Sequence, residues 1–227
     1  FMRSGGVWTE QQKLTASDGG EGSGGNRFGS SIAIDGDTLV VGSRGNDALG
    51  SDSGAAYVFV NSDGVWTEQQ KLTASDGEGG DWFSSGLGIS GDTIVVGAMW
   101  EDTWDFNSGA AYVFERSDGV WTEQQKLTAS YTGENQIHYN FGLSVTLQGN
   151  ILSVGVPGYD HPGLFGATAG IGAVYVFVRN AGAWIEQPKL TVNAYVAGDA
   201  LGNVVSISDS TVIANSTRDG GSVYVFD

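Results

Sequence analysis

The chain of 227 residues has no cysteine, only three prolines and two histidines, and no long apolar run. Without cysteine, disulfides, thiolate metal ligands and cysteine nucleophiles are excluded. A membrane-spanning helix needs about 18 or more consecutive apolar residues, so membrane insertion is not expected. The first residues, Phe1-Met2-Arg3, do not have the pattern of a signal peptide.

Positive charge is also scarce. Ten basic residues stand against 26 acidic ones, which gives a formal net charge of −16. Such a surface repels phosphate backbones and anionic lipids, so nucleic acid and membrane surfaces are poor partners. His138 and His161 lack zinc-ligand spacing, and no Gly-x-Ser-x-Gly elbow surrounds a serine. We therefore expect a protein that is not an enzyme.

What the chain does contain is glycine, aliphatic residues and a repeat. There are 37 glycines, and 40% of the residues are hydrophobic. Apolar stretches are short, rich in β-branched and aromatic residues, and bounded by Gly, Asp, Asn and Ser, while no stretch keeps a helical period. The pattern predicts an all-β chain of short strands and tight turns.

One stretch occurs three times almost unchanged and a fourth time in altered form. It covers Val7 to Gly19, Val65 to Gly77 and Val120 to Ser130, and it returns as Ala183 to Thr191. Repeats with a period near 50 residues are typical of solenoids and propellers, in which one copy cannot bury its own apolar face. We therefore predict a single domain over residues 1–227.

Each repeat unit contains four predicted strands. The first follows an aromatic–glycine step and the second follows a short polar turn. The third reads Gly-Ala-x-Tyr-Val-Phe, and the fourth is the tryptophan stretch. Four antiparallel strands repeated around an axis describe a β-propeller blade. The approximate units are 1–14 plus 201–227, 15–72, 73–127 and 128–190.

The chain opens with a fourth-strand copy and ends on a third strand. We predict a ring of four four-stranded antiparallel blades, closed by pairing of the N-terminal strand with the C-terminal blade. The alternative is an arc of a larger ring, for example one of seven blades. Strand alternation places Trp66, Glu68, Gln70 and Leu72 on one face of the outermost strand. Near identity between copies indicates a scaffold role for this strand.

The first two strands of each unit resemble the FG-GAP repeat family, the blades of the integrin alpha-chain propeller and of many bacterial extracellular proteins. Phe28-Gly29 and Phe141-Gly142 match the FG position, with Phe83-Ser84 and Leu201-Gly202 as variants. Gly42-Ser43-Arg44, Gly97-Ala98-Met99 and Gly155-Val156-Pro157 match the GAP position loosely, and Ala214-Asn215-Ser216 does not. The resemblance covers essentially the whole chain and implies an extracellular propeller. The family's Asp-x-Asp-x-Asp-Gly calcium loop is missing.

The connections between strands two and three and between strands four and one are long and differ between copies. They lie on one face of the predicted ring, where such folds carry binding sites and where the resembling integrins bind ligand. Aromatic rings beside carboxylates suit a glycan or a protein partner. The candidate ligand-binding residues are Trp82, Trp100, Trp104, Asp102, Asp105, Tyr139, Tyr159 and Asp160. Alternatively, these aromatics pack the loops and close the mouth of the ring.

No cofactor is firmly indicated, but a weak calcium site is one expectation. Its candidate ligands are Asp47, Asp52, Glu101, Asp102 and Asp105. The functional hypothesis is a non-enzymatic binding or adhesion module, extracellular or on the cell surface, with an extracellular protein or glycan as partner. One alternative is a carbohydrate-binding lectin that uses the same loops. The other is a structural repeat protein that assembles through blade edges into a homo-oligomer.

Overall fold

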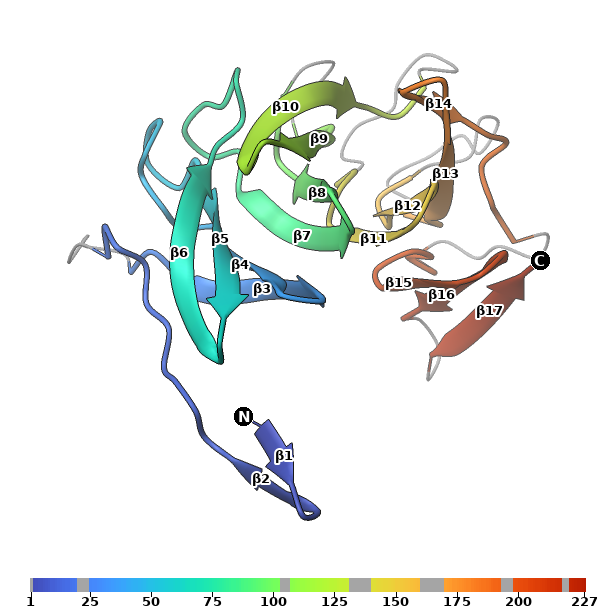
Figure 1. The fold of residues 1–227 in the computed structure, drawn as a ribbon. Helices are drawn as coiled ribbons and strands as arrows, with labels where there is room; N and C mark the ends of the chain where they lie inside the picture. Colours follow the sequence, from blue (N-terminus) through green and yellow to red (C-terminus); the bar gives the residue numbers. More distant parts are fainter. Residues whose placement is uncertain are drawn as a thin grey trace.

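The computed structural model describes residues 2–19, 25–102, 107–130, 140–159, 170–192, 198–217 and 221–227. Every regular element in these ranges is a β-strand, and they contain no helix that could span a membrane. The strands form successive antiparallel sheets that fan out around a common centre, as propeller blades do (Figure 1). The all-β propeller prediction is therefore confirmed.

Each sheet of three or four strands is one blade, with its strands in chain order from the centre outward (Figure 1). Blade one contains β3 (Phe28–Asp35), β4 (Thr38–Ser43), β5 (Ala55–Ser62) and β6 (Val65–Leu72). Blade two contains β7 (Phe83–Ser90), β8 (Thr93–Ala98), β9 (Ala110–Ser117) and β10 (Val120–Leu127). Blade three contains β11 (Ser144–Gln148), β12 (Ile151–Val156), β13 (Ala173–Asn180) and β14 (Ala183–Glu186). Blade four has three strands, β15 (Val205–Ser208), β16 (Thr211–Ser216) and β17 (Ser222–Phe226).

The hydrophobic cores lie between blades. We call the side of a blade that faces the next blade along the chain its front face, and the opposite side its back face. Val40, Val58 and Leu72 on the front face of blade one share a core with Leu87 and Ile89 on the back face of blade two. Corresponding residues form the core between blades two and three and the core between blades three and four. Each blade therefore needs a neighbour to cover both of its faces.

The first-strand phenylalanine organises the back face of three blades. Phe83 meets Tyr112 and Phe114 at ring-centroid distances of 5.6 and 6.1 Å. Phe28 and Phe141 make the same contacts in blades one and three. This explains why an aromatic residue at the start of strand one recurs together with Tyr-x-Phe in strand three. In blade four Leu201 takes the place of the phenylalanine and is also buried.

The prediction that Trp66, Glu68, Gln70 and Leu72 share one face of the tryptophan strand is wrong, because the strand contains a β-bulge. Strict alternation puts Trp66 and Leu72 on one face, but Trp66 packs on the back face of blade one and Leu72 on its front face. The pairing of β5 with β6 shifts at Gln69, and an extra residue in one strand turns the rest of that strand over. β10 has the same shift at Gln124. The fourth strand can therefore contact both neighbouring blades.

Side chains of the repeated stretch form hydrogen bonds that link the outer strands of adjacent blades. The side-chain amide of Gln70 accepts from the backbone N–H of Trp121 at 2.9 Å and donates to its carbonyl at 2.8 Å. Further along the repeat, the backbone N–H and hydroxyl of Ser75 donate to the carboxylate of Glu123 at 2.9 and 2.8 Å. The equivalent amide pairs are Gln12 with Trp66 and Gln125 with Trp184, and the equivalent serine pairs are Ser17 with Glu68 and Ser130 with Glu186.

The N-terminal segment does not pair with blade four. β1 (Met2–Ser4) and β2 (Val7–Thr9) form a hairpin of their own, and no bridge pair joins either strand to β17 in the part of the chain that the structure describes. Figure 1 shows the hairpin and blade four at separate places around the centre. Closure of a four-blade ring is therefore not seen, and the arrangement is the open arc that was the alternative prediction.

Candidate functional site

Every blade begins with a residue in the left-handed backbone region, just before its first strand. These residues are Arg27, Trp82, Asn140 and Ala200, with φ of 51°, 53°, 50° and 49°. The backbone N–H of Trp82 donates to the carbonyl of Asp52 at 3.2 Å, and Ala200 likewise donates to Gly170 at 2.8 Å. With the equivalent bond from Asn140 to Asn107 at 3.4 Å, these bonds attach the starts of blades two to four to the loop between strands two and three of the preceding blade. In blade two, this position brings the Trp82 side chain against Arg44 in that loop of blade one.

At Trp82 this arrangement assembles a cluster of aromatic rings and arginines. The rings of Trp82 and Trp100 lie 3.7 Å apart between centroids, tilted by 33°. The guanidinium carbons of Arg44 and Arg27 lie 4.6 and 5.2 Å from the Trp82 centroid. Since Trp100 occupies one face of Trp82, the arginines must take the other. We call Arg27, Arg44, Trp82 and Trp100 the Arg–Trp cluster.

Neither arginine of the cluster has a carboxylate partner among the described residues. Lys71, Arg116, Lys126 and Arg179 form ion pairs, whereas Arg27 and Arg44, like Lys13 and Lys189, form none in that part of the chain. Nε of Arg44 is buried and has no hydrogen-bond partner in the described structure. Two positive charges thus share one indole ring in a chain of net charge −16. Cation–π contact holds the guanidinium groups in place but leaves their N–H donors for an incoming acceptor.

An unusual carboxyl group, that of Asp81, lies next to the cluster in the sequence. Asp81 is buried, its side chain accepts from the backbone N–H of Glu78 at 2.7 Å, and its carbonyl accepts from the N–H of Trp100 at 3.3 Å. Burial, together with the negative charges of Glu101, Asp102 and Glu78, raises the pKa of Asp81 to about 6. The Asp81 carboxyl group beside the cluster therefore gains its negative charge as the pH rises through about 6.

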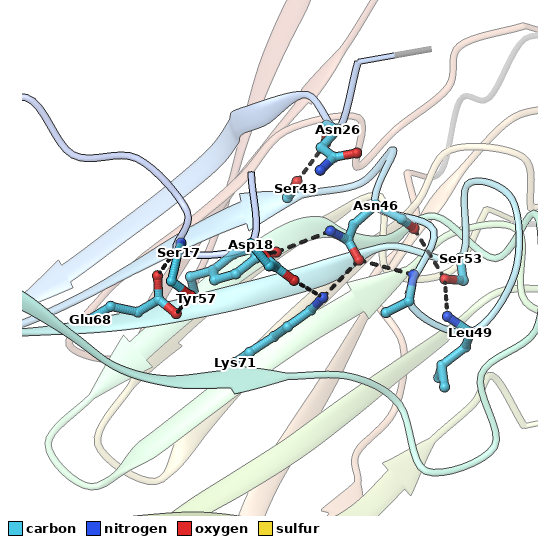
Figure 2. Close-up of polar contacts among 11 residues, drawn as sticks. Ser17, Asp18, Asn26, Ser43, Asn46, Leu49, Ser53, Tyr57, Glu68 and Lys71 are labelled. Carbon is cyan, nitrogen blue, oxygen red and sulfur yellow. Dashed lines mark hydrogen bonds and ion pairs between the residues drawn. The ribbon is translucent and has the colours of Figure 1, made fainter. Parts of the chain in front are cut away.

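Figure 2 shows the polar network that supports the loops of blade one. Asp18 accepts from Tyr57 Oη at 2.5 Å and from Lys71 Nζ at 2.6 Å, and Lys71 also donates to Asn46 at 3.0 Å. Burial would raise the pKa of Asp18, but the bonds from Lys71 and Tyr57 outweigh it and hold the pKa below its usual value. The loop that follows β4, which carries Arg44, is thereby attached to both the sheet and the N-terminal segment.

Blade two repeats this network below Trp100. Asp76 accepts from Tyr112 Oη at 2.8 Å and from Lys126 at 2.6 Å, while Lys126 also bonds Glu101 at 2.8 Å. Burial and the hydrogen bond to Asp76 raise the pKa of Tyr112 well above its usual value, so the phenol stays a donor. Glu101 is the neighbour of Trp100 in the sequence. The repeated network thus fixes the base of both loops that form the Arg–Trp cluster.

The comparisons with known proteins decide the family. The model of the FG-GAP repeat matches residues 8–59, 66–114 and 121–177, well over half of the chain. The chain belongs to the FG-GAP repeat family. The predicted resemblance is thereby confirmed over these segments.

No curated protein matches this FG-GAP chain significantly in sequence. Among solved structures, a Bacteroides uniformis protein provisionally named as a 6-phosphogluconolactonase is similar, with a TM-score of 0.44 and 13% sequence identity. The match covers 88% of this chain and 56% of that one, so the chain spans just over half the length of that structure. So distant a similarity carries no information about function.

The FG and GAP glycines of this family meet each other across the blade boundary. A Cβ on Gly97, at the GAP position of blade two, would lie 1.9 Å from the carbonyl oxygen of Gly142, at the FG position of blade three. Gly155 approaches Gly202 in the same way, since a Cβ added there would lie 1.8 Å from the carbonyl oxygen of Gly202. The signature is thus required by close backbone contact between blades. It does not describe a binding site.

The predicted ligand-binding residues of the FG-GAP chain fall into three groups. Trp82 and Trp100 come together in the Arg–Trp cluster, and Asp102 is exposed beside them in the sequence. Tyr159 was expected on the loop face but is buried against Tyr175 with Lys189 over its ring, because it occupies the loop-base position that Asn46 and Glu101 hold in other blades. Trp104, Asp105, Tyr139 and Asp160 lie outside the described residues.

The candidate calcium ligands belong to two separate loops. Asp47 accepts from the backbone N–H of Asp52 at 2.8 Å, and Asp102 accepts from that of Asn107 at 2.5 Å, so each aspartate closes its own loop. Glu101 is bonded to Lys126. Within the described ranges, no group of three acidic or histidine side chains could hold a metal ion. Asp105, the fifth predicted ligand, lies outside those ranges.

Arg27 and Arg44 are functional candidates that sequence reasoning missed. Aromatic and acidic residues dominate the predicted loops, and the few basic residues among them form no pattern of their own. A usable signal was present, because Arg27 and Trp82 occupy the same repeat position, just before the aromatic residue that opens strand one. The side chains of these two residues, from successive blades, meet in the structure.

Proposed function

We propose that the protein is a non-enzymatic extracellular binding or adhesion module that takes its ligand at the Arg–Trp cluster. The observation that carries the proposal is the pair of guanidinium groups held over Trp82, neither of which forms an ion pair within the described part of the chain. Guanidinium groups recognise carboxylate and sulfate groups through paired N–H donors. Membership of the FG-GAP family, whose repeats are typical of extracellular proteins, supports the proposed location.

The ligand group that fits is a single anionic group beside a flat apolar surface. Arg27 and Arg44 supply the donors, and the partly buried ring of Trp100 supplies the surface. The excess of acidic residues elsewhere disfavours polyanions, because long-range repulsion grows with each added negative charge. We expect an isolated carboxylate or sulfate on an extracellular protein to bind better than a polymer with a charge on every unit.

A lectin function is the second candidate, favoured by the aromatic part of the cluster. Tryptophan rings stack on the C–H faces of sugars, and a partly buried Trp100 in the same cluster as two arginines would suit a sugar acid. A neutral sugar fits less well, because Trp100 and the arginines already cover both faces of Trp82. The two candidates thus differ in the carrier of the anionic group.

An array of immobilised acidic peptides, carboxylated and sulfated glycans, and neutral glycans tests both candidates. Wild-type protein is compared with Arg44→Gln and Trp100→Ala, and Lys13→Gln is the control because it removes one exposed positive charge outside the cluster. We expect binding to acid-bearing spots that Arg44→Gln abolishes and Lys13→Gln keeps. Absence of glycan signals would remove the lectin candidate, and absence of acid-dependent binding to any spot would refute the proposed site.

A further inference from the structure

The back face of blade one exposes aliphatic residues that other blades bury. Ile32 in β3 is 70% exposed, whereas Leu87, at the same position in blade two, is 9% exposed. Ile34 is exposed too, although its counterparts Ile89 and Leu147 are buried. In blades two to four this position of strand one packs against the front face of the preceding blade. Blade one therefore presents half of a blade–blade interface.

The front face of blade four presents the other half. Val223 in β17 is 67% exposed, whereas Ala56, its counterpart in blade one, is 0% exposed. Val225 and Ile213 are also exposed, although Val58 and Val40, at the same positions in blade one, are buried. Three neighbouring aliphatic side chains on adjacent strands form an apolar patch of the kind that marks interaction sites.

The N-terminal segment fills only part of the gap at blade one. Leu14 and Ala16 pack on its back face, where they stand in for the Leu72 and Ala74 that blade one offers to blade two. Within the described ranges, the N-terminal segment supplies nothing equivalent to the other residues of a complete front face, which in blade one are Val40, Ala56 and Val58. Blade four exposes just these positions, as Ile213, Val223 and Val225. The two open faces are thus complementary, because each of the three internal interfaces also pairs the front face of one blade with the back face of the next.

We propose that a second copy of this chain docks head to tail, with the front face of blade four in one copy against the back face of blade one in the other. The internal blade–blade cores supply the template for this contact. A head-to-tail interface uses two different surfaces, so it generates rings or open chains of subunits. The proposal concerns the ends of the blade array and is independent of ligand binding at the Arg–Trp cluster.

One substitution makes the proposed contact weaker than the internal ones. Asn215 in β16 stands where blades one to three have Gly42, Gly97 and Gly155. A Cβ at Gly155 would lie 1.8 Å from the carbonyl oxygen of Gly202 in the next blade. Asn215 therefore keeps the inner ends of the docked blades apart, and self-association is reversible. Asn215→Gly removes this obstacle and should tighten it.

Sedimentation of the full chain over a concentration series provides the test. Wild type should exceed its monomer mass of 23.7 kDa as concentration rises. Ile34→Asp, which disables only the back face, and Val225→Asp, which disables only the front face, should each be monomeric. An equimolar mixture of the two variants retains one intact interface and should form heterodimers only. Heterodimer formation would also show that both variants are folded.

A matched control uses a valine that is exposed in all three copies of the repeat that carry it. Val65 begins β6 and is 55% exposed, like its counterparts in the other copies, so Val65→Asp should associate as wild type does. A wild-type chain that stays monomeric at every concentration would overturn the proposal. So would a mixture of Ile34→Asp and Val225→Asp that remains monomeric.

Chemical cross-linking separates a second copy from closure of the chain on itself. The chain has no cysteine, so Ile34→Cys with Val225→Cys introduces the only two thiols. A short bismaleimide should join these thiols between chains and produce dimers and larger species on a denaturing gel. A product that contains one internally linked chain would mean intramolecular closure and would contradict the proposal.

Discussion

Gln124 and Gln125 are neighbours of the same type in β10, but their environments differ. Gln125 reaches blade three and makes two hydrogen bonds with the backbone of Trp184, at 2.9 and 3.1 Å. Gln124 is the bulge residue and bonds only within its own strand, to Thr122. The three near-identical copies of the motif carry glutamine at both positions, so they do not tell the two residues apart; in the altered fourth copy only Gln124 has a glutamine counterpart, Gln187, and Pro188 stands in place of Gln125. The bulge determines which of them faces the next blade.

The first prediction compares alanine at these two positions. Gln125→Ala removes two bonds between blades and should lower the free energy of unfolding by about 1–2 kcal/mol. Gln124→Ala should change it by less than about 0.5 kcal/mol. Urea unfolding followed by tryptophan fluorescence measures both. Equal effects would mean that the amide pairs do not stabilise the contact between blades.

The second prediction concerns the buried carboxyl of Asp81. Its pKa is raised to about 6, mainly by burial, so its ionised form destabilises the folded state and stability falls as pH rises through this range. Asp81→Asn is neutral at every pH and can still accept from the N–H of Glu78. It should therefore raise the free energy of unfolding by about 1–2 kcal/mol at pH 8 and by little at pH 4. A melting series at both pH values checks this, and an equal gain at both would contradict the assignment.

At the scale of elements, an aspartate attaches the loop that follows two copies of the tryptophan stretch, Asp18 in the first and Asp76 in the second. Burial would raise the pKa of Asp76, but hydrogen bonds from Lys126 and Tyr112 outweigh this and hold it below its usual value. Its contribution to stability is therefore present above the unfolded-state pKa of about 4 and is lost as pH falls through the lower folded-state pKa.

The third prediction follows from the lowered pKa of Asp76 in the folded state. Asp76→Asn should melt below wild type at pH 6, and the difference should shrink as pH falls toward 2, because the wild type then loses the same interaction. Asp118→Asn is the control, since Asp118 is exposed in a hairpin turn. Calorimetry over this pH range measures all three proteins. A difference that stays constant with pH would show that the charge of Asp76 does not contribute.

The elements differ in how far the sequence could predict them. Strand order and blade boundaries follow from the repeat, and tight turns follow from residues such as Gly36 and Gly91 at positive φ. The bulges at Gln69 and Gln124 could not be read from alternation, because an inserted residue leaves the polar and apolar order unchanged. The Arg–Trp cluster was found only in part, since it unites residues of two blades that are distant in sequence.

For the whole molecule, the repeated and the variable parts have separate roles. Repeated residues such as Gln70 and Glu123 join blade to blade and are expected to determine stability. Variable residues such as Arg44 and Trp100 meet on the loop face, where we propose that ligand binds. Ring closure could not be predicted from the repeat count, because a terminal strand copy fits both a closed ring and an open arc.

The fourth prediction tests this separation of roles in one crossed experiment. Arg44→Gln and Gln125→Ala are each measured for melting temperature and for affinity toward the strongest acid-bearing ligand on the array. Arg44→Gln should lose at least about tenfold in affinity, the loss expected for a charge-assisted contact, and should melt close to wild type. Gln125→Ala should melt lower and bind as wild type does. If Arg44→Gln binds like wild type, or if both variants lose affinity equally, the proposed division between scaffold and binding site is wrong.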